Sequence, residues 1–150
     1  MNNSPTHAST TGQQAPHLLL GRNGEELAAT WLMRNGFSIL DRNWKSKYGG
    51  ELDIVAFRDN LIHVVEVKTR TSDFYEPMAS IDKKKLMRLS KGAAMYKRYH
   101  RLNYEIVIDA IRIVYHDEQH YDLKFIPNVH LIMYSRDFYR SRRENPYSES

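Results

Sequence analysis

Residues 50–70 constrain the fold most, because they have the composition of two strands that fold back on each other. The runs 52–57 and 61–67 are apolar except for Asp53, His63 and Glu66, and residues 58–60 between them have a turn composition. We expect Asp59 and Asn60 to be the two central turn residues. Counting outward from that turn, Asp53 faces Glu66 across the hairpin.

The same count sets Glu51 opposite Lys68, so four ionisable side chains meet in one patch on the hairpin. Two carboxylates about 5 Å apart repel each other by about 3 kcal/mol at an effective dielectric of ~20. A divalent cation would offset this repulsion, and Mg²⁺ is typically held by one or two carboxylates together with phosphate and water. The alternative is a pair of cross-strand salt bridges in which Lys68 neutralises Glu66 or Glu51 on a solvated face, although both strands are too apolar to face water.

The composition suits one domain with its own apolar core, because the chain has 150 residues of which 41% are hydrophobic. It contains no cysteine, which excludes disulfides and thiolate metal sites. Near the N-terminus no apolar stretch exceeds the triplet 18–20. We therefore expect neither a signal peptide nor a membrane span, and a cytoplasmic location.

Periodicity predicts the remaining elements. A helix is expected over 21–35 with Gly36 as its stop, a strand over 37–44, a helix over 82–100, and strands over 104–115 and 121–126. The segment 1–16 reads as a disordered tail, 17–135 as the domain, and 136–150 as a flexible C-terminal tail. Strand, helix and strand imply a right-handed crossover with parallel pairing. The expected fold is α/β, a mixed central sheet with helices packed on it in the order α-β-β-β-α-β-β.

Positive charge gathers in the second expected helix. The chain has a net charge of +4, and residues 82–101 hold eight Lys or Arg against one acid. Lys84, Lys91 and Arg98 recur every seven residues and form either a solvated basic face or a surface that tracks phosphates. Lys85 instead borders the apolar face, which we expect to comprise Leu86, Leu89, Ala93 and Tyr96.

Four further residues each have a structural and a functional interpretation. Glu25 borders the apolar stripe of the first helix and can approach the sheet, or it is simply an acid near a helix N-terminus, worth ~0.3–1 kcal/mol. Lys45 and Lys47 lie in a Gly-containing turn that either touches a phosphate backbone or is solvated. His63 shares the face of Val65 and is expected to be a histidine at the edge of the core, not a metal ligand.

The order and spacing of these residues carry a resemblance. Asp53, Glu66 and Lys68 form a D-x(12)-E-x-K pattern on a hairpin, after a helical Glu25 and before a helix with Lys85, which resembles the PD-(D/E)XK, or restriction-endonuclease-like, superfamily. The longer motifs GxxGEExAAxWLxxxGF, GGELDIVA and VVEVKTR make the chain similar to the YraN-type family of uncharacterised bacterial proteins. More distantly, the chain is similar to archaeal Holliday-junction resolvases. The resemblance covers roughly 21–130.

One position departs from the family pattern. Two residues before Asp109, where the family has Arg, this chain has Val107. A role for Asp109 is therefore in doubt, while the main motif is whole.

The resemblance implies a role for each motif residue. Asp53 and Glu66 would bind Mg²⁺ or Mn²⁺, joined by the Val67 carbonyl, and Glu25 would support the metal or its water. Lys68 would orient the attacking water or stabilise charge on the phosphate. Contacts to nucleic acid would come from Lys85, Lys45, Lys47 and Arg70.

The implied function is a metal-dependent endonuclease that hydrolyses phosphodiester bonds in DNA, in branched or single-stranded structures. The alternative is a nucleic-acid-binding module of the same fold with little or no turnover. A third class is a structural or protein-interaction domain that uses its tyrosines, with Tyr96 and Tyr99 expected to be exposed. DNA is the expected partner, and a homodimer is expected only by analogy with the resolvases.

Overall fold

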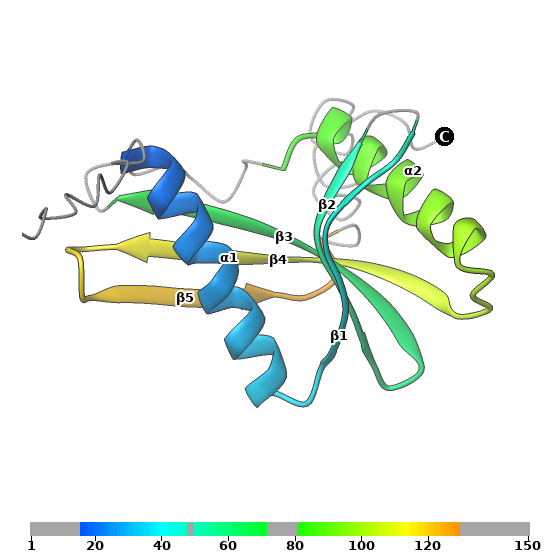
Figure 1. The fold of residues 1–150 in the computed structure, drawn as a ribbon, viewed down its shortest axis with the longest axis horizontal. Helices are drawn as coiled ribbons and strands as arrows, with labels where there is room; N and C mark the ends of the chain where they lie inside the picture. Colours follow the sequence, from blue (N-terminus) through cyan, green and yellow to red (C-terminus); the bar gives the residue numbers. More distant parts are fainter. Residues whose placement is uncertain (1–15, 48–49, 72–80, 130–150) are drawn as a thin grey trace, which may run out of the picture.

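A five-stranded sheet lies between two helices (Figure 1). The computed structural model describes residues 16–47, 50–71 and 81–129, with side chains from residue 23 onward. In chain order the elements are α1 (Pro16–Arg34), β1 (Ser38–Lys45), β2 (Glu51–Arg58), β3 (Leu61–Thr71), α2 (Lys83–Tyr99), β4 (Glu105–Tyr115) and β5 (Tyr121–Ile126). The predicted α/β class and element order are confirmed. The predicted tails, 1–16 and 136–150, lie almost wholly outside the described residues.

The sheet is mixed, with strand order β1-β2-β3-β4-β5. β1, β2 and β3 pair antiparallel, β3 and β4 pair parallel, and β5 returns antiparallel to β4. The parallel pair is joined through α2, as a strand-helix-strand crossover requires. In Figure 1 β1 and β2 run up the view whereas β4 and β5 run across it, which reflects the twist of the sheet.

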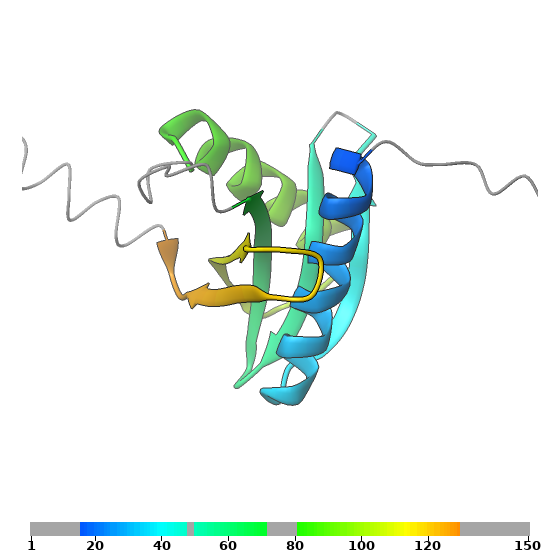
Figure 2. The ribbon, with the colours of Figure 1, turned by 90° about the vertical axis from the view of Figure 1, so that its left-hand side faces the viewer.

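Each face of the sheet carries its own apolar cluster, one under each helix (Figure 2). The cluster under α1 includes Ala28, Leu32, Ile54, Val65 and Ile111. The cluster under α2 includes Leu52, Val64, Leu86, Leu89 and Ala93. β2, β3 and β4 are therefore covered on both sides over most of their length, which explains why their sequences are nearly continuous apolar runs.

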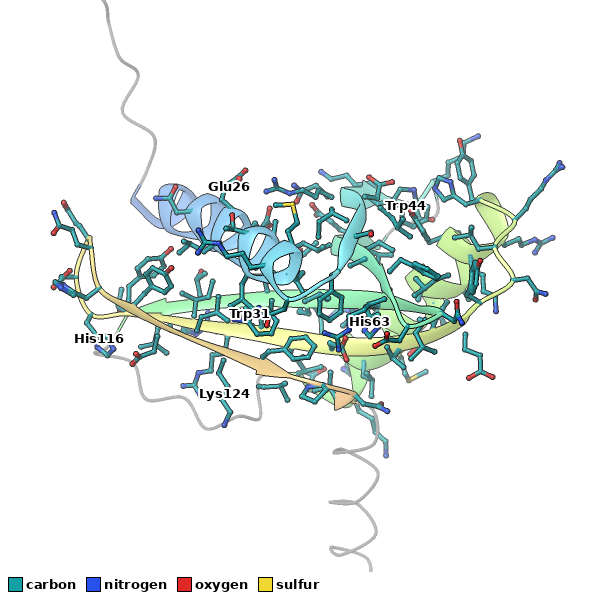
Figure 3. All side chains as sticks on the ribbon, turned by 90° about the horizontal axis from the view of Figure 1, so that it is seen from below. Glu26, Trp31, Trp44, His63, His116 and Lys124 are labelled. Carbon is teal, nitrogen blue, oxygen red and sulfur yellow. The ribbon has the colours of Figure 1, made fainter. Side chains whose placement is uncertain are left out.

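The apolar face predicted for α2 is buried, including Tyr96, which is only 3% exposed. Its ring meets Trp44, labelled in Figure 3, edge to face at 5.3 Å between centroids. The prediction that Tyr96 is exposed is therefore wrong, because one helical position cannot belong to both the packed face and the surface. Tyr99, at 72% exposed, lies on the surface as predicted.

The helix ends follow from capping. After α1, Gly36 adopts a φ of +83°, its N–H donates to the Met33 carbonyl, and the Phe37 N–H donates to the Leu32 carbonyl. The helix begins five residues earlier than the predicted residue 21, at Pro16, a residue type whose fixed φ suits the first helical position. α2 begins after Asp82, whose carboxylate accepts the Lys85 N–H at 2.7 Å.

The β2–β3 hairpin has the predicted turn and register. Asp59 and Asn60 have φ of +53° and +59°, as a two-residue type I′ turn requires. The ladder runs from Arg58–Leu61 at the turn to Ile54–Val65, where it stops. The predicted pairing of Glu51 with Lys68 is therefore wrong, and Glu51 pairs instead with Lys45 of β1.

None of the described helices has the length and apolarity needed to cross a membrane.

Candidate metal centre

Asp53 lies where β2 separates from β3, one residue beyond the last ladder pair. Its Oδ2 accepts the backbone N–H of Val67 at 2.9 Å, so a side-chain carboxylate satisfies a β3 donor that faces β2. The half-buried carboxylate is thereby held at the seam between the two strands. This accounts for the early end of the ladder and keeps Asp53 beside Glu66, as predicted.

The surroundings of Asp53 favour its neutral form. Burial raises the pKa of Asp53 to about 7, and the nearby Glu66 carboxylate adds to the rise. The Val67 N–H lowers the pKa, and the charge of Glu25 raises it. Acidic side chains from α1 and β3 thus both act on Asp53 of β2.

Glu66 is almost fully buried, at 5% exposed. Its Oε1 forms an ion pair with Lys85 Nζ of α2 at 2.8 Å, whereas its Oε2 is buried without a hydrogen-bond partner in the described part of the chain. A buried carboxylate oxygen without a donor is costly. Asp53 in its protonated form can donate a hydrogen bond to the Glu66 side chain, which also raises the pKa of Asp53, whereas ionised Asp53 cannot. Glu66 therefore presents an oxygen suited to a further positive charge.

Glu25 reaches this centre because α1 approaches β3 closely. A Cβ on Gly24 would lie 2.1 Å from Thr69 Cγ2, so this close contact with β3 requires glycine. Glu25 follows Gly24 directly, is half-buried, and acts on Asp53 through its charge. The predicted approach of Glu25 to the sheet is confirmed.

Lys68 lies two residues after Glu66 on β3 and so shares its face. In the parallel ladder between β3 and β4, Lys68 pairs with Arg112 and Glu66 pairs with Ala110. Sequence reasoning missed Arg112, although it is a charged residue in an otherwise apolar strand and the parallel register would have aligned it with Lys68. Two cations on adjacent strands therefore follow the carboxylates along one face.

The other predicted nucleic-acid contacts are less closely tied to this centre. Arg70 is half-buried on β3 and donates to the Thr69 carbonyl at 3.0 Å. Lys45 and Lys47 are exposed at the end of β1, on the chain that leads to β2. Neither Lys45 nor Lys47 forms a hydrogen bond or ion pair with Asp53 or Glu66 within the described ranges.

The residues present fit a hard divalent cation. Carboxylate oxygens are the ligands that Mg²⁺ prefers, and it often uses only one or two of them with water and phosphate. Asp53 and Glu66 offer that pair, and the unpartnered Oε2 of Glu66 is suited to a cation. No group of three or more His, Cys, Asp or Glu side chains within the described ranges is arranged to hold a metal ion. Glu25 therefore suits a supporting role better than direct ligation.

Known proteins resemble this chain over the same region. The model of the uncharacterised protein family UPF0102 matches residues 24–113. The chain belongs to this family. Among curated UPF0102 proteins, one from Paenarthrobacter aurescens is 46% identical over 57% of this chain and 70% of its own length. One from Clostridium perfringens is 39% identical over 71% of this chain and 89% of its own length. One from Campylobacter fetus is 40% identical over 74% of this chain and 93% of its own length.

Membership of UPF0102 confirms the resemblance to the YraN-type uncharacterised family. The matched region begins at Gly24, directly before Glu25, and ends at Ile113, directly after Arg112. It therefore contains the carboxylates and cations described above, and it leaves out β5.

A second polar pair lies away from the centre, inside the UPF0102 domain. His63 Nδ1 is 2.6 Å from Asp109 Oδ2, both side chains are buried, and Asp109 Oδ1 accepts the Asn128 N–H at 2.8 Å. His63, labelled in Figure 3, also meets the Phe37 ring edge to face at 4.9 Å. The expected place of His63 at the edge of the core is confirmed, and Asp109 joins β3, β4 and the segment after β5.

Proposed function

We propose that this protein is a metal-dependent endonuclease that hydrolyses phosphodiester bonds in DNA. The observation that carries the proposal is the meeting of Asp53 with Glu66, whose buried Oε2 has no partner among the described residues. Lys85 and Lys68 supply positive charge beside them. Phosphodiester hydrolysis needs a cation to stabilise charge and an aligned water, and these acids would supply the cation's ligands while the amines bind the phosphate.

The cofactor would be Mg²⁺ or Mn²⁺, held by Asp53 and Glu66 with the Val67 carbonyl, and when bound it would stabilise negative charge on the phosphate. In the reaction a water oxygen bonds to phosphorus while the bond to the leaving oxygen breaks, and that oxygen ends protonated. Lys68 would orient the water or stabilise the charge that develops on the phosphate. Lys85 would exchange its bond to Glu66 for one to a phosphate oxygen, and Glu25 would hold the water through its charge.

DNA is the proposed substrate because the helix that contributes Lys85 carries further cations on its surface. Lys84, Lys91 and Arg98 are exposed along α2, where they can contact successive phosphates. Lys45, Lys47 and Arg70 would add further contacts to the DNA. Branched or single-stranded DNA is the proposed form, and a homodimer, as in junction resolvases, is the proposed assembly.

The experiment is a cleavage assay with Mg²⁺ or Mn²⁺ on supercoiled, single-stranded and four-way-junction DNA. Asp53→Asn and Glu66→Gln should abolish cutting and leave DNA binding in EDTA intact. Asp59→Asn is the matched control, because it makes the same change in the exposed turn of the same hairpin. Cutting that survives both active-centre variants would contradict the proposal.

The alternative function, a binding module with little turnover, gives a different result in the same assay. DNA would bind with the same affinity with or without the divalent ion, and no substrate would be cut. The exposed cations of α2 would account for that binding as well.

A further inference from the structure

A pocket of about 620 Å³ lies at the C-terminal end of α2, away from the candidate metal centre. Its apolar lining comes from Ala94 on the helix, Leu102 after it and Ile106 on β4. Its polar lining comes from Lys97, Arg98, Arg101 and Glu105. The pocket thus combines an apolar floor with three cations and one acid.

The three cations are available to a ligand. None of Lys97, Arg98 and Arg101 forms a salt bridge with an acidic residue in the described part of the chain, and both arginines are exposed. Guanidinium planes stack on bases and also form paired hydrogen bonds with phosphate. The exposed Glu105 carboxylate would repel a bare phosphate bound beside it, but it can accept hydrogen bonds from the amino groups of a base.

The pocket and the candidate metal centre lie towards opposite ends of α2. α2 runs from Lys85, bonded to Glu66, to Arg98 at the pocket, and in Figure 1 its two ends lie far apart. Thirteen residues of helix span about 20 Å at 1.5 Å per residue. Lys91 is exposed about midway along this length of helix. At 3.4 Å per nucleotide along a duplex strand, this length corresponds to about six nucleotides.

We propose that this pocket holds an unpaired nucleotide of the DNA whose phosphates follow α2. The base lies on Ala94, Leu102 and Ile106, the arginines stack on it or bind its phosphate, and Glu105 accepts from its amino group. A paired base cannot enter, because its edge is occupied and both its faces are stacked. The pocket therefore selects DNA with a single-stranded branch or end. The DNA that follows α2 and its position relative to the cut rest on the proposed function, whereas the binding of an unpaired nucleotide does not require cleavage.

Binding tests the pocket without cleavage. The affinity of the full chain in EDTA is measured by fluorescence anisotropy for a blunt duplex and for the same duplex with a single-stranded extension. Combining Arg98→Gln with Arg101→Gln should weaken binding of the extended DNA about tenfold and of the blunt duplex two- to threefold. Ala94→Leu, which fills the floor and keeps every charge, should weaken only binding of the extended DNA.

The matched control combines Arg34→Gln with Lys124→Gln, which removes the same charge from exposed positions outside the pocket. It should lower both affinities by the same small factor. Equal losses for the two DNAs in the pocket variants would overturn the proposal, as would an Ala94→Leu variant that is folded and binds like the wild type. Tight binding of a free mononucleotide, equal to that of the extended DNA, would also overturn it.

The two proposals fail separately. If no DNA is cut but the extended duplex still binds through the pocket, the endonuclease proposal falls and the pocket stands. If Asp53→Asn abolishes cutting while the pocket variants bind both DNAs like the wild type, the pocket falls and the endonuclease stands.

Discussion

Lys85 Nζ lies 2.8 Å from Glu66 Oε1 and joins a half-exposed ammonium to an almost fully buried carboxylate. The lysine comes from α2 and the acid from β3, so the ion pair links a helix to the sheet at the candidate metal centre. An acid this deeply buried depends on a cation. Lys85 supplies that charge here, and a divalent ion would supply it in the proposed enzyme.

Replacing Lys85 with Met should lower the free energy of unfolding by about 1–3 kcal/mol, because it leaves the buried Glu66 carboxylate unpaired. Adding Mn²⁺ should then raise the melting temperature more in the variant than in the wild type, since the ion no longer competes with an ammonium. Thermal unfolding with and without Mn²⁺ measures both effects. Lys84→Met, on the exposed face of the same helix, should show neither effect. A smaller Mn²⁺ effect in Lys85→Met than in the wild type would contradict this exchange.

The pKa of Asp53 makes stability depend on pH. The folded value is raised to about 7 from an ordinary value of 3.8, so between about pH 4 and 7 the folded state binds more protons than the unfolded state. The Asp53 contribution is therefore full below about pH 4 and is lost as the pH rises through 7, by at most roughly 4 kcal/mol. Asp53→Asn should flatten this decline, as measured by urea unfolding across that range.

The same shift predicts proton release on metal binding. Below pH 7 in the metal-free protein Asp53 carries a proton that a cation must displace, so Mn²⁺ binding should release up to about one proton near pH 6 and few above pH 8. Calorimetry in buffers of different ionisation enthalpy counts these protons. Binding with no proton release at pH 6 would mean that the cation does not use Asp53.

Gly24→Ala should destabilise the protein by about 1–3 kcal/mol, because the new methyl group would lie 2.1 Å from Thr69 Cγ2 and push α1 away from β3. Thr69→Ser removes that methyl group and should restore most of the loss in the double variant. Urea unfolding of the two single variants and the double variant measures this coupling. Purely additive effects would show that the close contact does not fix the position of α1.

The hairpin could be predicted because local rules decide it. Asp59 and Asn60 are residue types that tolerate positive φ, and a two-residue turn sets the register of the strands beside it. The structure confirms both the predicted turn and the predicted register next to it. The ends of the first helix show the limit of periodicity, since it located the stop at Gly36 but missed the start at Pro16.

Contacts between distant segments were beyond sequence reasoning. The alternation of side chains along the strands puts Asp53 beside Glu66. It does not reveal that the Asp53 carboxylate accepts a hydrogen bond from the Val67 N–H, or that the β2–β3 ladder ends there. A helical wheel does not reveal the ion pair between Lys85 and Glu66 either, because this contact depends on where α2 crosses the sheet. The partner of His63 needed the parallel register of β3 and β4, which aligns Val65 with Asp109.

Asp109→Asn should destabilise the fold by roughly 2–4 kcal/mol, because His63 loses its charged partner in a buried site. The Asn128 N–H should keep its acceptor, since the amide oxygen can replace Oδ1. Cleavage per folded molecule should not change, because this pair lies apart from the metal centre. Loss of cleavage at a temperature where the variant is fully folded would give Asp109 a catalytic role instead.

The most direct measurement is a crystal structure of the protein soaked with Mg²⁺, and with Mn²⁺ to locate the ion by its anomalous signal. We expect one ion with an oxygen of Asp53 and an oxygen of Glu66 both about 2.0–2.1 Å from the Mg²⁺, and with Lys85 Nζ withdrawn from Glu66. An ion bound elsewhere, or a saturating soak that leaves the Lys85–Glu66 pair intact and no ion between the two acids, would contradict it.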